Sequence, residues 1–472
     1  MKYYIYPNGG NAKYIAWAID FLNSVYPANN KDIYSFVDDV DENNSLKVLS
    51  KIIKKEIMEG KSKLLLASPV HSDQLLENIR NCKISECYDG VSLIAEKLNL
   101  YFKEKYKDHK RIIAIMLNGY ELTQKHLGDI PERLENSGFK IIYIVTFSSR
   151  WSEGLENKLK NAKKDYLFAE FEFLEHLDFF PFLIEQADMV RVNYKVKSLK
   201  LFTSMENIES GIFCSENYIE ARNYAFATSS YLNIHFNSIY SNIADRQRFF
   251  DIFPNSHLRL IKGGYPSIDK QKTILNYNTK RDTVIIVSSD PLYLEISRFS
   301  GIITELLENG LRVLFKKHPV HTEYDIAENR FAEKFLKYKD FVYYKEPRLS
   351  NDELGRSITL IGQVSSMVYS FPVQSGRPAI LLYPSRNSID ESKLLKDTFF
   401  NSNLHMRFFK EEDDAILENI KKLAYNKEYQ KKWQEKIEEF CNYDLYNYGC
   451  ASEYIANWII DWYNKRDLLV KD

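Results

Sequence analysis

The chain has few cysteines and no long apolar run. It contains 5 cysteines, an odd number, with no Cys-x-x-Cys pair, so neither a disulfide framework nor a zinc site is indicated. No run of 18 apolar residues occurs, so no segment is expected to span a membrane. The residues before Pro7 predict a short strand with one lysine and no secretory leader. Together these absences predict a cytoplasmic protein.

An excess of one charge sign is also absent. The sequence has 64 Lys and Arg against 65 Asp and Glu, whereas a nucleic-acid-binding protein is expected to carry a basic excess. Nucleic acid is therefore not an expected partner. Apolar residues make up 44% of the chain and charged residues 27%, which is typical of a folded globular protein. The length of 472 residues exceeds one ordinary core and predicts two domains.

Strand and helix patterns alternate along both halves of the chain. Near-continuous Ile, Leu and Val in the strand-like runs predict parallel sheets covered by helices, and hence an α/β fold. The polar segment 268–282 is the expected linker between the halves, and helices are expected at 413–433 and 452–462. The expected strands lie at 3–6, 33–37, 63–67, 111–117, 140–146, 283–288, 311–315 and 378–383.

The stretch between residues 314 and 384 is the most informative part of the sequence. A strand-like run leads through Lys316 to His318 and Pro319, and later Ser365 and Ser366 stand at the expected start of a helix. Free backbone N–H groups and hydroxyls at a helix N-terminus bind phosphate well. An imidazole held by the next proline can add a hydrogen bond or a positive charge. The pattern predicts a metal-independent binding site for a nucleotide phosphate. Packing of His318 and simple helix capping by the serines remain alternatives.

Three motifs in order carry a resemblance to known enzymes. They read GGYPSID at 263–269, KKHP at 316–319 and VSSM at 364–367. This series resembles the CDP-glycerol glycerophosphotransferases of teichoic-acid and capsule synthesis, while the run SSMVYSFP resembles the related bacterial sialyltransferases and Kdo transferases. The chain departs from the first family at Gln363 and Val364, where that family usually has an Asp-Tyr pair. The resemblance covers residues 255 to 390.

The resemblance implies the GT-B fold, with two Rossmann-like domains, a cleft between them and C-terminal helices that pack back on the first domain. Residues 1–262 would form the acceptor-side domain and residues 263–472 the donor-binding domain. The donor-binding residues would be Lys316, His318, Pro319, Ser365, Ser366, Gly263, Gly264 and Tyr265. An interdomain hinge is an alternative role for the two glycines, because adjacent glycines tolerate unusual backbone angles.

The activity implied is transfer from a cytidine-activated donor to a bacterial surface glycan, such as a capsule, a teichoic-acid-like polymer or lipooligosaccharide. The group moved would be a polyol phosphate or, alternatively, a sugar from CMP-sialic acid or CMP-Kdo. A third alternative is a GT-B-shaped binding or assembly protein without catalysis. The expected partners are the donor and the glycan acceptor, with peripheral contact at the inner membrane left open. No cofactor and no metal are expected.

The catalytic base is expected in the first half of the chain. Glycerophosphotransferases use a histidine and sialyltransferases a carboxylate near an Asp-Gly pair, so the candidates are Glu121, His71 and His235. Glu121 and His71 follow expected strands. Asp89-Gly90 matches the dipeptide, but no strand is expected before it.

Two further loops are open to interpretation. Asn8, Gly9 and Gly10 follow the first expected strand and predict either an acceptor-facing loop or an ordinary turn. They do not form a Gly-x-Gly-x-x-Gly dinucleotide fingerprint. The acidic run at 38–42 is expected to be a solvated loop and not a metal site.

Overall fold

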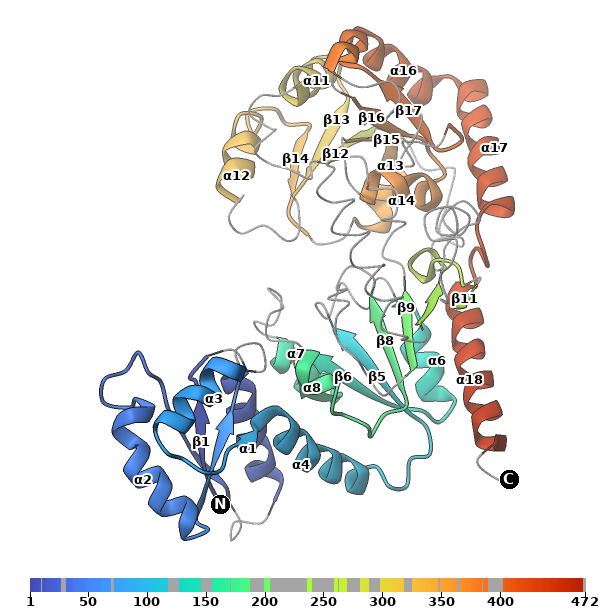
Figure 1. The fold of residues 1–472 in the computed structure, drawn as a ribbon. Helices are drawn as coiled ribbons and strands as arrows, with labels where there is room; N and C mark the ends of the chain where they lie inside the picture. The colour runs from blue at the N-terminus through green and yellow to red at the C-terminus, as the bar shows by residue number, and fades with distance from the viewer. Residues whose placement is uncertain are drawn as a thin grey trace.

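The computed structural model describes only part of the chain. That part comprises residues 1–9, 11–26, 31–68, 72–117, 127–145, 155–169, 171–186, 199–203, 236–239, 259–261, 263–269, 281–287, 298–317, 325–346, 349–362, 366–383, 385–388 and 402–469. It folds into three parallel sheets covered by helices, which confirms the predicted α/β class (Figure 1).

The first sheet has four strands in the order β2-β1-β3-β4. Its strands are β1 (Lys2–Tyr6), β2 (Ile33–Phe36), β3 (Ser62–Leu66) and β4 (Tyr88–Asp89), and its helices are α1 (Ala12–Val25), α2 (Leu46–Met58), α3 (Ser72–Asn81) and α4 (Gly90–Lys105). Alternate side chains of β1 point to opposite faces, so Ile5 packs with α1 and α4 while Tyr4 packs with α2 and α3. The expectation that no strand precedes Gly90 is wrong, because the two residues of β4 pair with β3.

The second sheet has seven parallel strands in the order β11-β10-β9-β8-β5-β6-β7. Its strands are β5 (Ile112–Leu117), β6 (Lys140–Val145), β7 (Asp165–Phe168), β8 (Phe182–Gln186), β9 (Leu199–Thr203), β10 (Phe236–Ile239) and β11 (Arg259–Ile261), and helices α6 (Ile130–Asn136), α7 (Leu155–Asn161) and α8 (Phe171–Leu174) lie between them in the chain. All six residues of β5 are buried, as expected for a central strand. The strand order reverses between β5 and β8.

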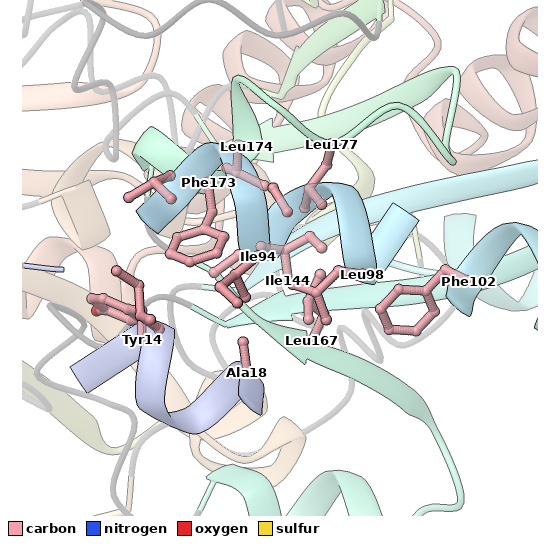
Figure 2. Close-up of a cluster of buried hydrophobic side chains, with 14 of the residues drawn as sticks. Tyr14, Ala18, Ile94, Leu98, Phe102, Ile144, Leu167, Phe173, Leu174 and Leu177 are labelled. Atoms are coloured by element: carbon pink, nitrogen blue, oxygen red, sulfur yellow. The ribbon is translucent and has the colours of Figure 1, made fainter. Parts of the chain in front are cut away.

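Helices α1 and α4 lie between the first and second sheets and join them through one core. Figure 2 shows side chains of α1 and α4 packed against residues of β6, β7 and α8. The labelled members are Tyr14, Ala18, Ile94, Leu98, Phe102, Ile144, Leu167, Phe173, Leu174 and Leu177. The stretch predicted as one Rossmann-like domain, residues 1–262, therefore contains two sheets that share a buried layer. The domain division at residue 262 remains a prediction.

The third sheet has six parallel strands in the order β14-β13-β12-β15-β16-β17. Its strands are β12 (Thr283–Val287), β13 (Arg312–Lys316), β14 (Phe341–Tyr344), β15 (Ser357–Gly362), β16 (Ala379–Leu382) and β17 (His405–Phe408). Its helices are α11 (Arg298–Glu308), α12 (Asp325–Glu333), α13 (Asn351–Arg356), α14 (Ser366–Ser375), α16 (Asp414–Tyr425) and α17 (Lys427–Tyr443). The order reverses between β12 and β15. The helix expected at 413–433 is two helices, because Asn426 ends α16 and its side chain caps α17 at the Tyr429 N–H.

The last helix, α18 (Ala451–Leu469), returns to the second sheet. Ile455, Ile459 and Tyr463 are buried in the same cluster as β5, β6 and α6, and the Tyr463 hydroxyl donates to the carbonyl of Ile112. Figure 1 shows α17 along the six-stranded sheet and α18 along the seven-stranded one. Two Rossmann-like sheets with a returning C-terminal helix are the predicted GT-B architecture, here preceded by a smaller sheet.

Candidate functional site

The reversal point of the six-stranded sheet is the natural place for a ligand. In open α/β sheets, ligands bind outside the carboxyl ends of the strands where the strand order reverses. Here β12 and β15 flank that point, and β13 pairs with β12 on its other side. The strands that precede both predicted phosphate motifs therefore end at one edge of one sheet. His318, Pro319 and Ser365 themselves lie outside the described residues, and Ser366 opens α14.

Gly362 brings α14 close to this reversal point. It is the last residue of β15, and a Cβ atom placed on it would lie 2.7 Å from Cγ2 of Val287, at the end of β12. The same Cβ would lie 2.7 Å from Cγ2 of Val368, in the first turn of α14. Such distances are shorter than van der Waals contact, so only glycine fits. The absence of a side chain at residue 362 allows the start of α14 to pack directly on the strand ends.

The body of α14 is buried and held by polar contacts. Its residues Val368, Phe371 and Val373 are all less than 5% exposed. On β17, the Nε2 atom of His405 lies 3.2 Å from the carbonyl oxygen of Val368. Burial of His405 lowers the pKa of its imidazole to about 3, against the opposing effect of that hydrogen bond, so the ring is neutral at physiological pH.

Lys316, a predicted donor ligand, lies at the end of β13 and is 3% exposed. Its ammonium group donates to the main-chain carbonyl of Lys317 at 2.7 Å and lies 5.9 Å from the ring centre of Tyr344. These contacts hold Lys316 against its own strand edge. A contact with a donor phosphate remains a prediction for this residue.

The predicted element at 263–269 meets the returning end of the chain. Gly264 has a φ of +88°, and a Cβ atom there would lie only 2.1 Å from the carbonyl oxygen of Tyr446. The side-chain amide of Asn447 donates to the carbonyl of Gly263 at 3.1 Å. Tyr265 is buried. Packing against residues 446 and 447 thus explains why glycine is needed at 264.

Asp269 completes this junction by capping α18. Its carboxylate accepts the backbone N–H groups of Ala451 at 2.9 Å and Ser452 at 2.7 Å. Burial raises the pKa of Asp269 even though these hydrogen bonds act to lower it. The hydroxyl of Ser452 in turn accepts the Asp129 N–H at 3.3 Å. Hydrogen bonds of Asp269 and Ser452 therefore connect the 263–269 motif, the start of α18 and residue 129. A nucleotide contact for Gly263, Gly264 or Tyr265 remains a prediction.

The acceptor-side candidates fall into different parts of the fold. Asn8 and Gly9 are exposed after β1, at the edge where the order of the four-stranded sheet reverses between β1 and β3. Gly10 and His71 lie outside the described residues, and His71 follows β3. Glu121, also outside, follows β5 at the reversal point of the seven-stranded sheet. His235 is outside as well. It comes directly before β10 in the chain, so it adjoins the amino end of that strand.

The Asp89-Gly90 pair has a structural role in the described fold. The Asp89 carboxylate caps α4, accepting the N–H groups of Val91 at 3.0 Å and Ser92 at 3.2 Å. A Cβ on Gly90 would lie 2.8 Å from Cδ1 of Ile15, so glycine permits close packing of α4 on α1. These contacts explain the dipeptide without a catalytic function.

The acidic loop at 38–42 is tied to its own surroundings. The Asp39 carboxylate accepts hydrogen bonds from the Tyr6 hydroxyl and the Leu46 N–H, and Asp41 accepts the Asn43 and Asn44 N–H groups. Within the described ranges, no group of three or more His, Cys, Asp or Glu side chains could hold a metal ion. No helix in the same ranges is long and apolar enough to cross a membrane.

Gly362, Pro372 of α14 and His405 were not predicted from the sequence as parts of this site. Gly362 stands just before the serine motif, where a glycine at a strand end could have indicated a close approach. Pro372 inside a helical pattern could have indicated an unbonded carbonyl four residues earlier. His405 gave no signal, because its partner is distant in the sequence.

Comparisons with known proteins give distant structural neighbours only. No protein-family model matches the chain, and no curated protein matches its sequence. The wall teichoic acid polymerase TagF is 15% identical with a TM-score of 0.47, over 85% of this chain and 99% of that one. The UDP-GlcNAc 2-epimerase from Neisseria meningitidis is 12% identical with a TM-score of 0.43, over 74% and 100%. The spinosyn forosaminyltransferase SpnP is 11% identical with a TM-score of 0.38, over 75% and 100%. The GT-B architecture follows from the strand orders of the sheets.

Proposed function

We propose that the protein is a metal-independent GT-B transferase that moves a polyol-phosphate group from a cytidine-activated donor to a bacterial surface glycan. One observation carries the proposal. The strands that precede the His-Pro and Ser-Ser motifs, β13 and β15, end at the same edge of the six-stranded sheet and flank β12. A phosphate placed there would lie at the edge where β13, which leads to His318, and β15, which leads to α14, both end.

In the proposed reaction, an acceptor hydroxyl loses its proton to a base and attacks the β-phosphorus of the CDP-polyol. The new bond joins the acceptor oxygen to that phosphorus, and the bond to the bridging oxygen breaks, so CMP leaves with the electron pair. Negative charge then develops on the leaving phosphate. His318, Ser365, Ser366 and the N-terminal amides of α14 would stabilise it, because preorganised donors at a helix N-terminus favour anions.

We propose Glu121 as the base. It follows β5, the strand at the reversal point of the seven-stranded sheet, and the N-terminal half of a GT-B enzyme supplies the acceptor side. His71 follows a strand of the smaller sheet instead, and His235 precedes its strand. The loop after β5 is thus the counterpart of the loop after β12, the strand that β13 and β15 flank.

We also propose a peripheral contact with the inner membrane through α2. Val48, Ile52 and Met58 on this helix are 57%, 51% and 81% exposed, and Lys51 and Lys55 are exposed beside them. An amphipathic surface of apolar and basic residues suits anionic lipid headgroups. The double variant Ile52→Asp, Lys51→Glu should lose co-sedimentation with phosphatidylglycerol vesicles. Retained co-sedimentation would exclude α2 as the contact.

A donor screen tests the proposed activity. The purified protein is incubated with an acceptor glycan extract and CDP-glycerol, CMP-sialic acid or CMP-Kdo, and released CMP is measured by mass spectrometry. CMP release from CDP-glycerol, unchanged in EDTA, is the expected result. Release from CMP-sialic acid or CMP-Kdo alone would identify the sugar-transferring alternative. A strict requirement for magnesium or manganese would contradict the metal-independent site.

Calorimetry with CMP, CDP and UDP separates catalysis from binding alone. Cytidine-selective binding without turnover on any acceptor would support the binding or assembly protein. Preferential binding of UDP would exclude the cytidine donor.

A further inference from the structure

Pro372 leaves a gap in the hydrogen bonding of α14. In an α-helix the N–H of residue 372 would bond to the carbonyl of residue 368, but proline has no N–H. The Val368 carbonyl therefore lacks its regular main-chain donor. Val368 is fully buried, so water cannot readily take that place. A buried carbonyl without a donor is costly, and folded proteins nearly always supply one.

His405 supplies the donor from another element. It begins β17, is 1% exposed, and places its Nε2 atom 3.2 Å from the Val368 oxygen. Burial keeps its pKa at about 3, so the imidazole is neutral and only one ring nitrogen carries a proton. Because the partner is a carbonyl, which only accepts, we assign that proton to Nε2.

The other end of α14 is held independently. The guanidinium of Arg377 donates to the carbonyls of Ser375, the last residue of the helix, and of Gly355 at 3.1 Å. A cation at a helix C-terminus is also favoured by the helix dipole. The first turn of α14 is thus fixed by His405 and by the contact of Val368 with Gly362, and the last turn by Arg377.

We infer that His405 is a positioning residue, which replaces the main-chain donor lost at Pro372 and thereby fixes the first turn of α14 at the reversal point of the sheet. This inference rests on the proposed function, because it gives the start of α14 its purpose as a phosphate site. His405 is 1% exposed, so the role inferred for it involves no direct contact with substrate. It acts through the Val368 carbonyl on the orientation of the N-terminal amides of the helix.

The inference predicts that His405 and Pro372 are coupled. The variant His405→Leu removes the side-chain donor, and Pro372→Ala restores the main-chain donor. CMP affinity by calorimetry and the unfolding midpoint in urea are measured for both variants, the double variant and the wild type. His405→Leu should weaken CMP binding about tenfold, as expected when a buried acceptor loses its partner. The double variant should recover most of that loss.

The variant His405→Gln is a second probe, because the glutamine amide keeps an N–H that can donate to the Val368 carbonyl. It also keeps the inference testable if His405→Leu does not fold. CMP affinity closer to wild type for His405→Gln than for His405→Leu supports the inference. A double variant as weak as His405→Leu would overturn it. Coupling in the unfolding midpoint with unchanged CMP affinity would also overturn it, since the residue would then be structural alone.

The same measurements distinguish this inference from the proposed function. If the wild type binds neither CMP nor CDP, the proposed function fails, and the positioning role fails with it. Coupling in the urea midpoint would still establish the hydrogen-bond replacement itself. If the wild type binds CMP and the variants show no coupling, only the positioning role fails.

Discussion

The six-stranded and seven-stranded sheets share a winding order but differ at their reversal points. Each begins with a central strand, β12 or β5, adds two strands on one side and places the later strands on the other. In the six-stranded sheet, the buried helix α14 packs directly on the strand ends because Gly362 has no side chain. In the seven-stranded sheet, α18 packs Ile455 and Tyr463 against β5 and β6 instead, and Tyr463 donates to Ile112 at the amino end of β5, away from the carboxyl edge.

Strand order determines where a ligand can bind, whereas the residues that follow the strands determine which ligand binds. In the chain, His318 and the serine pair follow strands that end near one reversal point. Glu121 follows the strand at the other reversal point. The proposal assigns the leaving phosphate to the first and the acceptor hydroxyl to the second.

The junction between the two sheets should be the position most sensitive to substitution. Gly264→Ala places a Cβ against the Tyr446 carbonyl and strains a positive φ, so the free energy of unfolding should fall by about 3–5 kcal/mol. The matched control is Gly138→Ala, where φ is +83° and nothing lies within 4 Å of the added atom. That variant should lose only about 1–2 kcal/mol. Equal losses in urea unfolding would contradict tight packing at Gly264.

Substitutions at the two reversal points should separate donor binding from proton transfer. His318→Ala should lower turnover by about a hundredfold or more and weaken CMP binding, because a donor to the leaving phosphate is lost. Glu121→Gln should also lower turnover by about a hundredfold while CMP affinity stays unchanged. A sharp fall in the melting temperature of His318→Ala with retained activity would show that this histidine is structural.

Close packing at Gly362 should be required for a well-placed α14. Gly362→Ala introduces overlaps with Val287 and Val368, so it should cost about 1–3 kcal/mol in stability and weaken CMP binding. Gly301→Ala is the control, since Gly301 lies in α11 with open space around it. That change should be neutral or stabilising by up to about 1 kcal/mol, as expected for alanine in a helix. Urea unfolding and calorimetry measure both effects, and an unaffected Gly362→Ala variant would refute the close approach.

The buried imidazole of His405 should make stability depend on pH. Because its folded pKa of about 3 lies below the ordinary value of 6.5, the unfolded chain binds this proton first as the pH falls. The contribution of His405 to the free energy of unfolding is complete above pH 6.5. Below that value it should fall by about 1.4 kcal/mol per pH unit, down to about pH 3. His405→Gln should lose this component of the slope, whereas His109→Gln, at an exposed position, should keep it. Parallel slopes for His405→Gln and wild type would be inconsistent with a buried neutral ring.

The serine pair should show the smallest effect, a coupling between two donors to one phosphate. Ser365→Ala and Ser366→Ala should each weaken CMP binding, and the double variant should deviate from the sum by at least about 0.5 kcal/mol. Simple capping predicts instead about 1 kcal/mol of lost stability at one serine and unchanged affinity. Measuring affinity and unfolding on the same three variants decides between them.

Much of the fold could be predicted because its signals are local. Apolar runs gave β5, β12 and β13 to within a residue or two, and Ser366 does open α14. The two-residue strand β4 is too short to leave a pattern, and Asn426 divides the expected helix at 413–433 through a cap. The presence of two sheets before residue 262 depends on α1 and α4 lying between them, which is a tertiary arrangement that periodicity does not encode.

In the candidate site, too, only the features with local sequence signals could be predicted. The motif residues follow strands and could be placed at a sheet edge from the sequence. The contacts that orient α14 could not, because Gly362 meets Val287 and His405 meets Val368 across long separations in the chain. The role of Asp269 was hidden for the same reason, since the N–H groups that it caps belong to Ala451 and Ser452.

The capping of α18 by Asp269 has a consequence for how the molecule can move. Tyr265 and Ile268 are already buried with the six-stranded sheet, and the chain has left that sheet before Ala451, so the entering and leaving segments lie side by side at the Asp269 cap. A body attached at one place can swing about it without stretching either connection. The six-stranded sheet could therefore rotate towards the rest of the protein around this point. The same adjacency makes the segment between residues 263 and 451 a candidate for removal or exchange as one piece, because Tyr265 and Ile268 belong to its core and a short linker would rejoin the cut ends.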